Sequence, residues 1–136
     1  MVKTLILRTD GGARGNPGSA AIGVVIEDKT GQEIKTISHY IGEATNNQAE
    51  YKAIYAGLKA AKEIGVQEII CYLDSELVVK QLKLEYKVKD KELAPLFIKT
   101  WNLAQEFKEI KFIHVPRERN KRADWLVNQA LDKYEK

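Results

Sequence analysis

The chain has 136 residues, 44% of them hydrophobic and 30% charged, with a formal net charge of +3. We expect one globular domain, residues 1–136, because this length suits a single core and we find no repeat, linker or low-complexity tract. The single cysteine, Cys71, excludes a disulfide framework and favours a reducing, cytoplasmic setting. The apolar stretch at the N-terminus is too short for a secretory signal or a membrane span, so we expect no membrane role.

Three strands are predicted first, at residues 2–10, 20–28 and 32–41, because these segments are rich in Val, Ile, Thr and Tyr. The second and third are separated by a short turn with Gly31 near a left-handed position, which predicts an antiparallel hairpin. A helix should follow, because Thr45 and Gln48 form a T-x-x-Q capping box and alanines recur at helical spacing as far as Gly65.

The second half of the chain alternates between strands and helices. Residues 66–74 read as a strand, 75–84 as a short helix, 109–115 as a strand and 116–120 as a loop. Two further helices are indicated by apolar faces, the first made of Leu93, Phe97, Trp101 and Ala104, the second of Ala123, Leu126, Val127, Ala130 and Tyr134. The order βββαβααβα predicts an α/β fold with a five-stranded mixed sheet, three strands antiparallel and then two parallel, flanked by helices.

Basic residues are concentrated near the C-terminal helix. Six lie between Lys108 and Arg122, against two acidic residues. This excess favours a nucleic-acid partner, although a solvated loop would have the same composition.

Four acidic residues are candidates for one site. Asp10 and Asp74 each end a predicted strand, and the ends of neighbouring parallel strands meet at one sheet edge. Glu50 lies early in the first helix and Asp124 in the first turn of the last. Each acid alone is also explained by a helix cap, a helix dipole or a turn.

If the four acids converge, they require a cation. Two carboxylates about 5 Å apart repel by roughly 3 kcal/mol at an effective dielectric near 20. Hard oxygen ligands select Mg²⁺ or Mn²⁺. The two histidines, His39 and His114, sit singly in predicted strands and form no zinc set.

The segment GGARGNPG after Asp10 is rich in glycine but is not a nucleotide-binding P-loop. It lacks the G-K-[ST] ending, and it leads into a strand instead of a helix. A tight turn explains it, and so does a close approach of bare backbone to a ligand beside Asp10.

The segments TDGGARGNPG, TNNQAE, YLDS and NKRAD, in this order across nearly the whole chain, resemble the type 1 ribonuclease H family. The resemblance implies a ribonuclease H-like fold and an endonuclease that cuts the RNA strand of RNA/DNA hybrids, leaving a 5′-phosphate and a 3′-hydroxyl. Asp10, Glu50, Asp74 and Asp124 match the family's metal-binding carboxylates. They would hold two Mg²⁺ ions about 4 Å apart, one activating a water and one stabilising the leaving oxygen, with Mn²⁺ as a substitute.

The resemblance also implies contacts with the hybrid. The residues that match the family's minor-groove contacts are Asn16, Asn46, Asn47 and Gln48, and Thr45 matches a contact to a DNA phosphate. Backbone near Gly11 and Gly12 would touch RNA 2′-hydroxyls, the groups that distinguish RNA from DNA. Helix capping is an alternative role for residues 45–48.

The chain departs from the family pattern in two places. Many members carry a histidine in the loop before the last helix, whereas this loop has none, and Arg117 is our candidate for that place. An arginine cannot shuttle protons near neutral pH, so it would draw charge from the phosphate or assist product departure; an exposed arginine without a role is the alternative. Leu84 to Glu92 is short where some relatives insert a basic helix, which predicts weaker, more salt-sensitive binding.

Two other functions remain compatible with this reading. A catalytically silent binder of hybrid or double-stranded RNA would keep the groove residues but lose carboxylates, and all four are present. A junction resolvase or transposase core would share the strand-end aspartate but not the TNNQAE segment. We expect a monomer.

Overall fold

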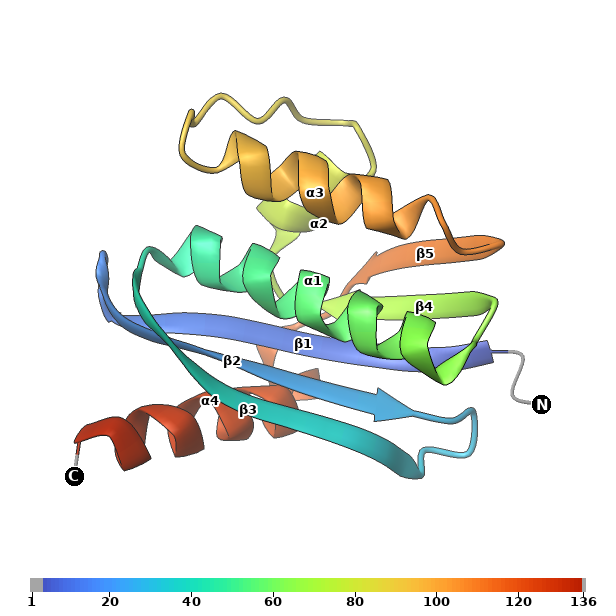
Figure 1. Cartoon of the computed structure of the whole chain (residues 1–136), viewed down its shortest axis with the longest axis horizontal. Coiled ribbons are helices and arrows are strands. Elements are labelled where there is room, and N and C mark those ends of the chain that lie inside the picture. Colours follow the sequence, from blue (N-terminus) through green and yellow to red (C-terminus); the bar gives the residue numbers. More distant parts are fainter. Residues whose placement is uncertain (1–3, 136) are drawn as a thin grey trace.

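The computed structural model describes residues 4–135 as a mixed sheet covered by helices on both faces (Figure 1). The strands are β1 (Thr4–Gly15), β2 (Gly18–Glu27), β3 (Glu33–Ala44), β4 (Glu68–Leu73) and β5 (Glu109–His114). The helices are α1 (Asn46–Ile64), α2 (Glu76–Leu82), α3 (Ala94–Ala104) and α4 (Lys121–Glu135), and a single 3-10 turn, η1 (Arg117–Arg119), precedes α4. No helix in these residues is long and apolar enough to cross a bilayer.

The sheet has the order β3-β2-β1-β4-β5, with β1, β2 and β3 antiparallel and β1, β4 and β5 parallel. This confirms the predicted mixed sheet. Connections between the parallel strands run through helices, as parallel pairing requires.

The main core lies between the sheet and the helices α1, α2 and α3. Leu5 and Leu7 of β1 point to this side and are fully buried with Ile54 and Leu58 of α1. The second face is covered by α4 over β1, β2 and β3, where Ala123 and Leu126 pack on Val25. Figure 1 shows α1 and α4 on opposite faces of the sheet.

Helix α1 starts and ends where its sequence predicts. The Thr45 side chain accepts a hydrogen bond from the Gln48 amide, the Gln48 side chain accepts one from the Thr45 amide, and Gly65 ends the helix at φ 92°. This is the reciprocal capping box followed by a left-handed glycine. Gly31 has φ 92° in the turn between β2 and β3, as predicted.

Two segments and one side chain differ from the sequence-based expectations. β1 does not stop at Asp10 but continues to Gly15, because GGARG pairs in register with β2. The predicted loop 116–120 contains the turn η1. Tyr134 is 55% exposed and stacks on Tyr40, and Leu131 takes the buried place on α4. The first two residues of the predicted strand 2–10 lie outside the described residues.

Candidate active site

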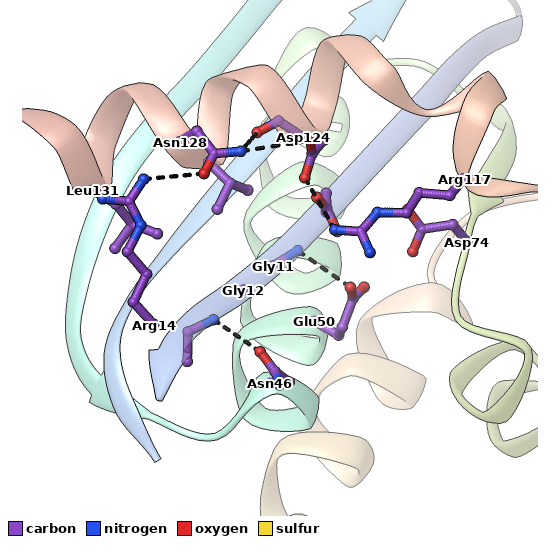
Figure 2. Close-up of a pocket in the computed structure, with 13 residues that line it drawn as sticks. Gly11, Gly12, Arg14, Asn46, Glu50, Asp74, Arg117, Asp124, Asn128 and Leu131 are labelled. Atoms are coloured by element: carbon purple, nitrogen blue, oxygen red, sulfur yellow. Dashed lines mark hydrogen bonds and ion pairs between the residues drawn. The ribbon is translucent and has the colours of Figure 1, made fainter. Parts of the chain in front are cut away.

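The site forms along one edge of β1, beyond the point where its neighbour β4 ends. The parallel ladder between these strands stops at the pair Arg8 and Tyr72, whereas β1 stays paired with β2 as far as Gly15. The backbone of β1 on the β4 side therefore needs other partners. Helix α1 supplies two of them: the Gly11 amide donates to Glu50 Oε1 at 3.4 Å, and the Ala13 amide donates to Asn46 Oδ1 at 2.9 Å (Figure 2).

Gly11 allows α1 to come this close. A Cβ atom at Gly11 would lie 2.2 Å from the backbone carbonyl of Ala49. Any other residue would push the helix, and Glu50 with it, away from the strand. The glycine-rich segment is therefore a strand that presents bare backbone to α1.

Three carboxylates meet beside this edge. One oxygen from each of Asp10, Glu50 and Asp74 lies within 4.8 Å of the others. Asp10 and Asp74 come together because the register of β1 on β4, Leu7 opposite Cys71 and Arg8 opposite Tyr72, carries both chains to the same level two residues later. The strand-end argument thus places these two acids correctly, although Asp10 lies inside a longer strand.

Burial strongly affects the protonation of this group. Asp10 and Glu50 are each only 7% exposed. Burial raises the pKa of Asp10 to about 7; the hydrogen bond with Glu50 opposes this rise, and the charge of Asp74 adds to it. Burial, together with the nearby charge of Asp10, raises the pKa of Glu50 well above its usual range. Without a cation, the folded chain therefore holds protons on these carboxyl groups at pH values where exposed acids are ionised.

Asp124 shares the pocket but is not part of the three-residue group. The pocket has a volume of about 500 Å³ and is lined by all four acids, with Gly11, Gly12, Asn46 and Arg117 among its other residues. Asp124 lies close enough to Asp10 to contribute to its raised pKa. Its carboxylate also lies 3.6 Å from the guanidinium of Arg117, whose side chain is 80% exposed (Figure 2).

The donor set suits a hard divalent cation. Oxygen ligands are the ones that Mg²⁺ and Mn²⁺ prefer, and the grouped oxygens come from three separate elements. Glu50 Oε2 is buried and has no hydrogen-bond partner among residues 4–135, as expected for an oxygen reserved for a ligand. Asp10, Glu50 and Asp74 would hold the ion, with Asp124 at the open side.

The predicted hybrid-binding residues lie beside the carboxylates, where α1 begins and the β1–β2 hairpin turns. Asn16, Asn46 and Asn47 are exposed, whereas Thr45 and Gln48 are partly buried. Asn16 Oδ1 accepts from the Asn46 amide at 2.9 Å, and Asn46 Oδ1 accepts from Ala13. With both oxygens used, each side chain keeps its NH₂ group as a donor toward solvent. Thr45 and Gln48 are occupied as the capping box.

Two features of the site were missed by reasoning from the sequence. Arg14 joins the hairpin to α4 through Asp132 at 2.7 Å and Asn128 Oδ1 at 3.1 Å. Asn120 is buried against Thr9 and Asp74. The motif N-x-x-x-D contained Asn120, and a polar residue directly before an apolar helix was the only available signal.

Comparison with known proteins identifies the family. A family model described as reverse transcriptase-like matches residues 8–130. LC11-RNase H1, isolated from compost, is 46% identical and superposes with a TM-score of 0.93. The match covers 100% of this chain and 100% of that one. RNase H1 from Halobacterium salinarum is 41% identical with a TM-score of 0.93, covering 96% of this chain and 98% of that one. The chain belongs to the type 1 ribonuclease H family.

Some curated relatives are much longer than this chain. A bifunctional protein of Mycobacterium tuberculosis is 41% identical over 129 residues, which are 94% of this chain and 35% of that protein. The chain thus spans about a third of the length of this relative.

A structure of LC11-RNase H1 in complex with an RNA/DNA hybrid is 45% identical with a TM-score of 0.92, covering 97% of this chain and 99% of that one.

Proposed function

We propose that this chain hydrolyses the RNA strand of RNA/DNA hybrids with the help of two divalent ions, Mg²⁺ or Mn²⁺, and leaves a 5′-phosphate and a 3′-hydroxyl. The observation that carries the proposal is the group of three carboxylates, two of them buried, beside an exposed row of amide donors. A type 1 ribonuclease H relative that was solved with such a hybrid supports the substrate.

Metal ions bound here would lower the pKa of an attacking water and stabilise charge on the leaving 3′ oxygen. The chain's own contribution is to hold the ligands. Because Asp10 and Glu50 are buried, they hold protons more readily than exposed acids do. A cation must displace those protons, and it then neutralises the charge that deprotonation leaves in the buried site. Asp74 directly follows β4 and Asp124 lies in the first turn of α4. The set of four carboxylates is therefore complete only when strand and helix are both in place.

The groove residues would select the hybrid. The free NH₂ groups of Asn16 and Asn46 can donate to acceptors in a shallow minor groove, where RNA 2′-hydroxyls are exposed. Asn47 and Gln48 would extend this row along α1, and Thr45, the N-cap of α1, would contact a DNA phosphate. The backbone of Gly11 and Gly12 lies between the row and the carboxylates. Such contacts read shape, so we expect low sequence specificity.

Arg117 would stabilise negative charge at the phosphate. Its guanidinium is exposed and pairs with Asp124 at 3.6 Å, a position from which it can turn to an incoming phosphate. A guanidinium group serves as a hydrogen-bond donor and not as a general base.

A panel of labelled substrates tests the proposal. RNA/DNA hybrid, double-stranded RNA and double-stranded DNA are incubated with the chain in Mg²⁺ and, separately, in chelator. We expect cleavage of the hybrid in Mg²⁺ alone, and loss of cleavage with retained binding for Asp10→Asn. Binding without cleavage by the unaltered chain would favour a silent hybrid binder, and cleavage of double-stranded DNA would favour a resolvase or transposase core. Light scattering of the same sample would show whether it is a monomer, as we also propose.

A further inference from the structure

Asn120 is a buried polar side chain that contacts three elements of the site. It is 1% exposed and lies between η1 and α4. Its side-chain NH₂ group donates to the Thr9 carbonyl of β1 at 2.8 Å and to Asp74 Oδ2 at 3.2 Å. The backbone carbonyl of Asn120 accepts a hydrogen bond from the backbone amide of Asp124 at 3.1 Å. One residue therefore connects the three segments that carry Asp10, Asp74 and Asp124.

The position of Asn120 explains why it is needed. The ladder between β1 and β4 ends at the pair Arg8 and Tyr72, so on the β4 side of β1 the Thr9 carbonyl has no strand partner. The Asn120 amide takes the bond that another strand would have made, and the same nitrogen reaches the first residue after β4. The side chain thus bridges β1 and β4 where the two separate, one residue from Asp10.

The orientation of the amide is set by these acceptors. Turning it over would place its oxygen against a carbonyl and a carboxylate, so only the observed orientation gives both a donor. Asn120 Oδ1 is buried and has no partner in the described part of the chain, a cost that is consistent with the two donors being what this position requires.

A neutral amide suits this task better than a cation. It fixes Asp74 Oδ2 without bringing a positive charge that would compete with a metal ion for the carboxylate. The other carboxylate oxygen, Asp74 Oδ1, stays available to the site. An arginine or lysine here would hold Asp74 but would also neutralise it.

We propose that Asn120 is a positioning residue that orients Asp74 relative to Asp10 and thereby sets the affinity of the site for divalent cations. This inference rests on the metal site of the proposed function, but not on the identity of the nucleic acid. Asn120 would not touch the substrate.

The first test measures Mn²⁺ affinity of the nucleic-acid-free chain by titration calorimetry for the unaltered protein and for Asn120→Ala. Loss of a residue that orients a metal ligand weakens binding or activity by about 10- to 100-fold, so we expect Mn²⁺ affinity to fall at least about tenfold. In hybrid cleavage, the Mn²⁺ concentration for half-maximal rate should rise similarly, with KM for the hybrid unchanged at saturating metal.

Ser38→Ala is the matched control. Ser38 of β3 donates to the Leu126 carbonyl of α4 at 2.6 Å, so this variant also removes a side-chain donor to a backbone carbonyl but leaves Asp74 untouched. We expect its Mn²⁺ affinity to equal that of the unaltered chain. An equal loss of affinity in both variants, or no loss in Asn120→Ala, would overturn the proposal.

A second measurement requires no variant and is independent of whether Asn120→Ala folds. In the NMR spectrum of the unaltered chain, the Asn120 side-chain protons should exchange with solvent far more slowly than those of exposed Asn47. Equal exchange would refute the bridge. If the unaltered chain binds Mn²⁺ but leaves the hybrid intact, the proposed function fails, whereas the inference about Asn120 is still decided by the calorimetry and the exchange measurement.

Discussion

The replacement Asp10→Asn should stabilise the metal-free protein while it abolishes hybrid cleavage. The pKa of Asp10 is about 7 in the folded chain, against an ordinary value of 3.8. Between these values the folded state keeps a proton that the unfolded chain has released. The free energy of unfolding therefore falls as pH rises from about 4 to about 7, and the whole cost of the buried carboxylate is present above that range.

The size of the effect follows from this shift in pKa. One pKa unit corresponds to about 1.4 kcal/mol, so the buried carboxylate costs roughly 1.7 kcal/mol at pH 5 and roughly 4 kcal/mol at pH 8. An asparagine keeps the shape and removes the charge. In chelator, the variant should thus be more stable than the unaltered chain by an amount that grows about 2.5 kcal/mol between these pH values.

Urea unfolding followed by circular dichroism at both pH values measures this difference. Mg²⁺ should stabilise the unaltered chain much more than the variant, because the variant lacks one carboxylate ligand and binds the cation more weakly. A stability difference that stays constant with pH, or a variant less stable than the unaltered chain at pH 8, would refute the reasoning that burial of Asp10 raises its pKa.

Three further changes separate packing, binding and charge. Gly11→Ala should lower the free energy of unfolding by about 3 kcal/mol or more in urea, since its Cβ would lie 2.2 Å from the Ala49 backbone; a stable variant with full activity would contradict the need for this close approach. Asn47→Ala should raise KM for the hybrid a fewfold without changing kcat or urea stability, because the side chain is exposed; an unchanged KM would remove Asn47 from the groove. Arg117→Ala should lower kcat about tenfold or more in steady-state cleavage, with unchanged stability, and a normal kcat would leave Arg117 as an exposed arginine only.

Local patterns predicted most of the fold. The capping box of Thr45 and Gln48, the alanine face that follows and Gly65 determine α1 by short-range interactions, so its limits were readable. The proximity of Asp10 and Asp74 could be predicted because their strands are parallel neighbours in the sheet. β1 was predicted too short, because glycines are poor strand formers in isolation, and only the pairing of GGARG with β2 makes this segment a strand.

Contacts between distant segments explain what the sequence did not reveal. Asn120 acts across 111 residues on Thr9 and across 46 on Asp74, and no local pattern records such a bridge. The sequence likewise did not reveal that three of the acids form the close group while Asp124 lies beside it. The place of Asp124 depends on how α4 packs against the sheet.

The length of β1 has a geometric consequence. Asp10 and Gly15 belong to one extended strand, which rises about 3.3 Å per residue, so roughly 17 Å separates the carboxylates from the hairpin tip. Bonds from α1 and α4 hold both ends of this span. A duplex that bound at the tip would therefore lie at a fixed distance from the carboxylates. The length of the strand would thus set how far along the duplex the contacts at the tip lie from the carboxylates.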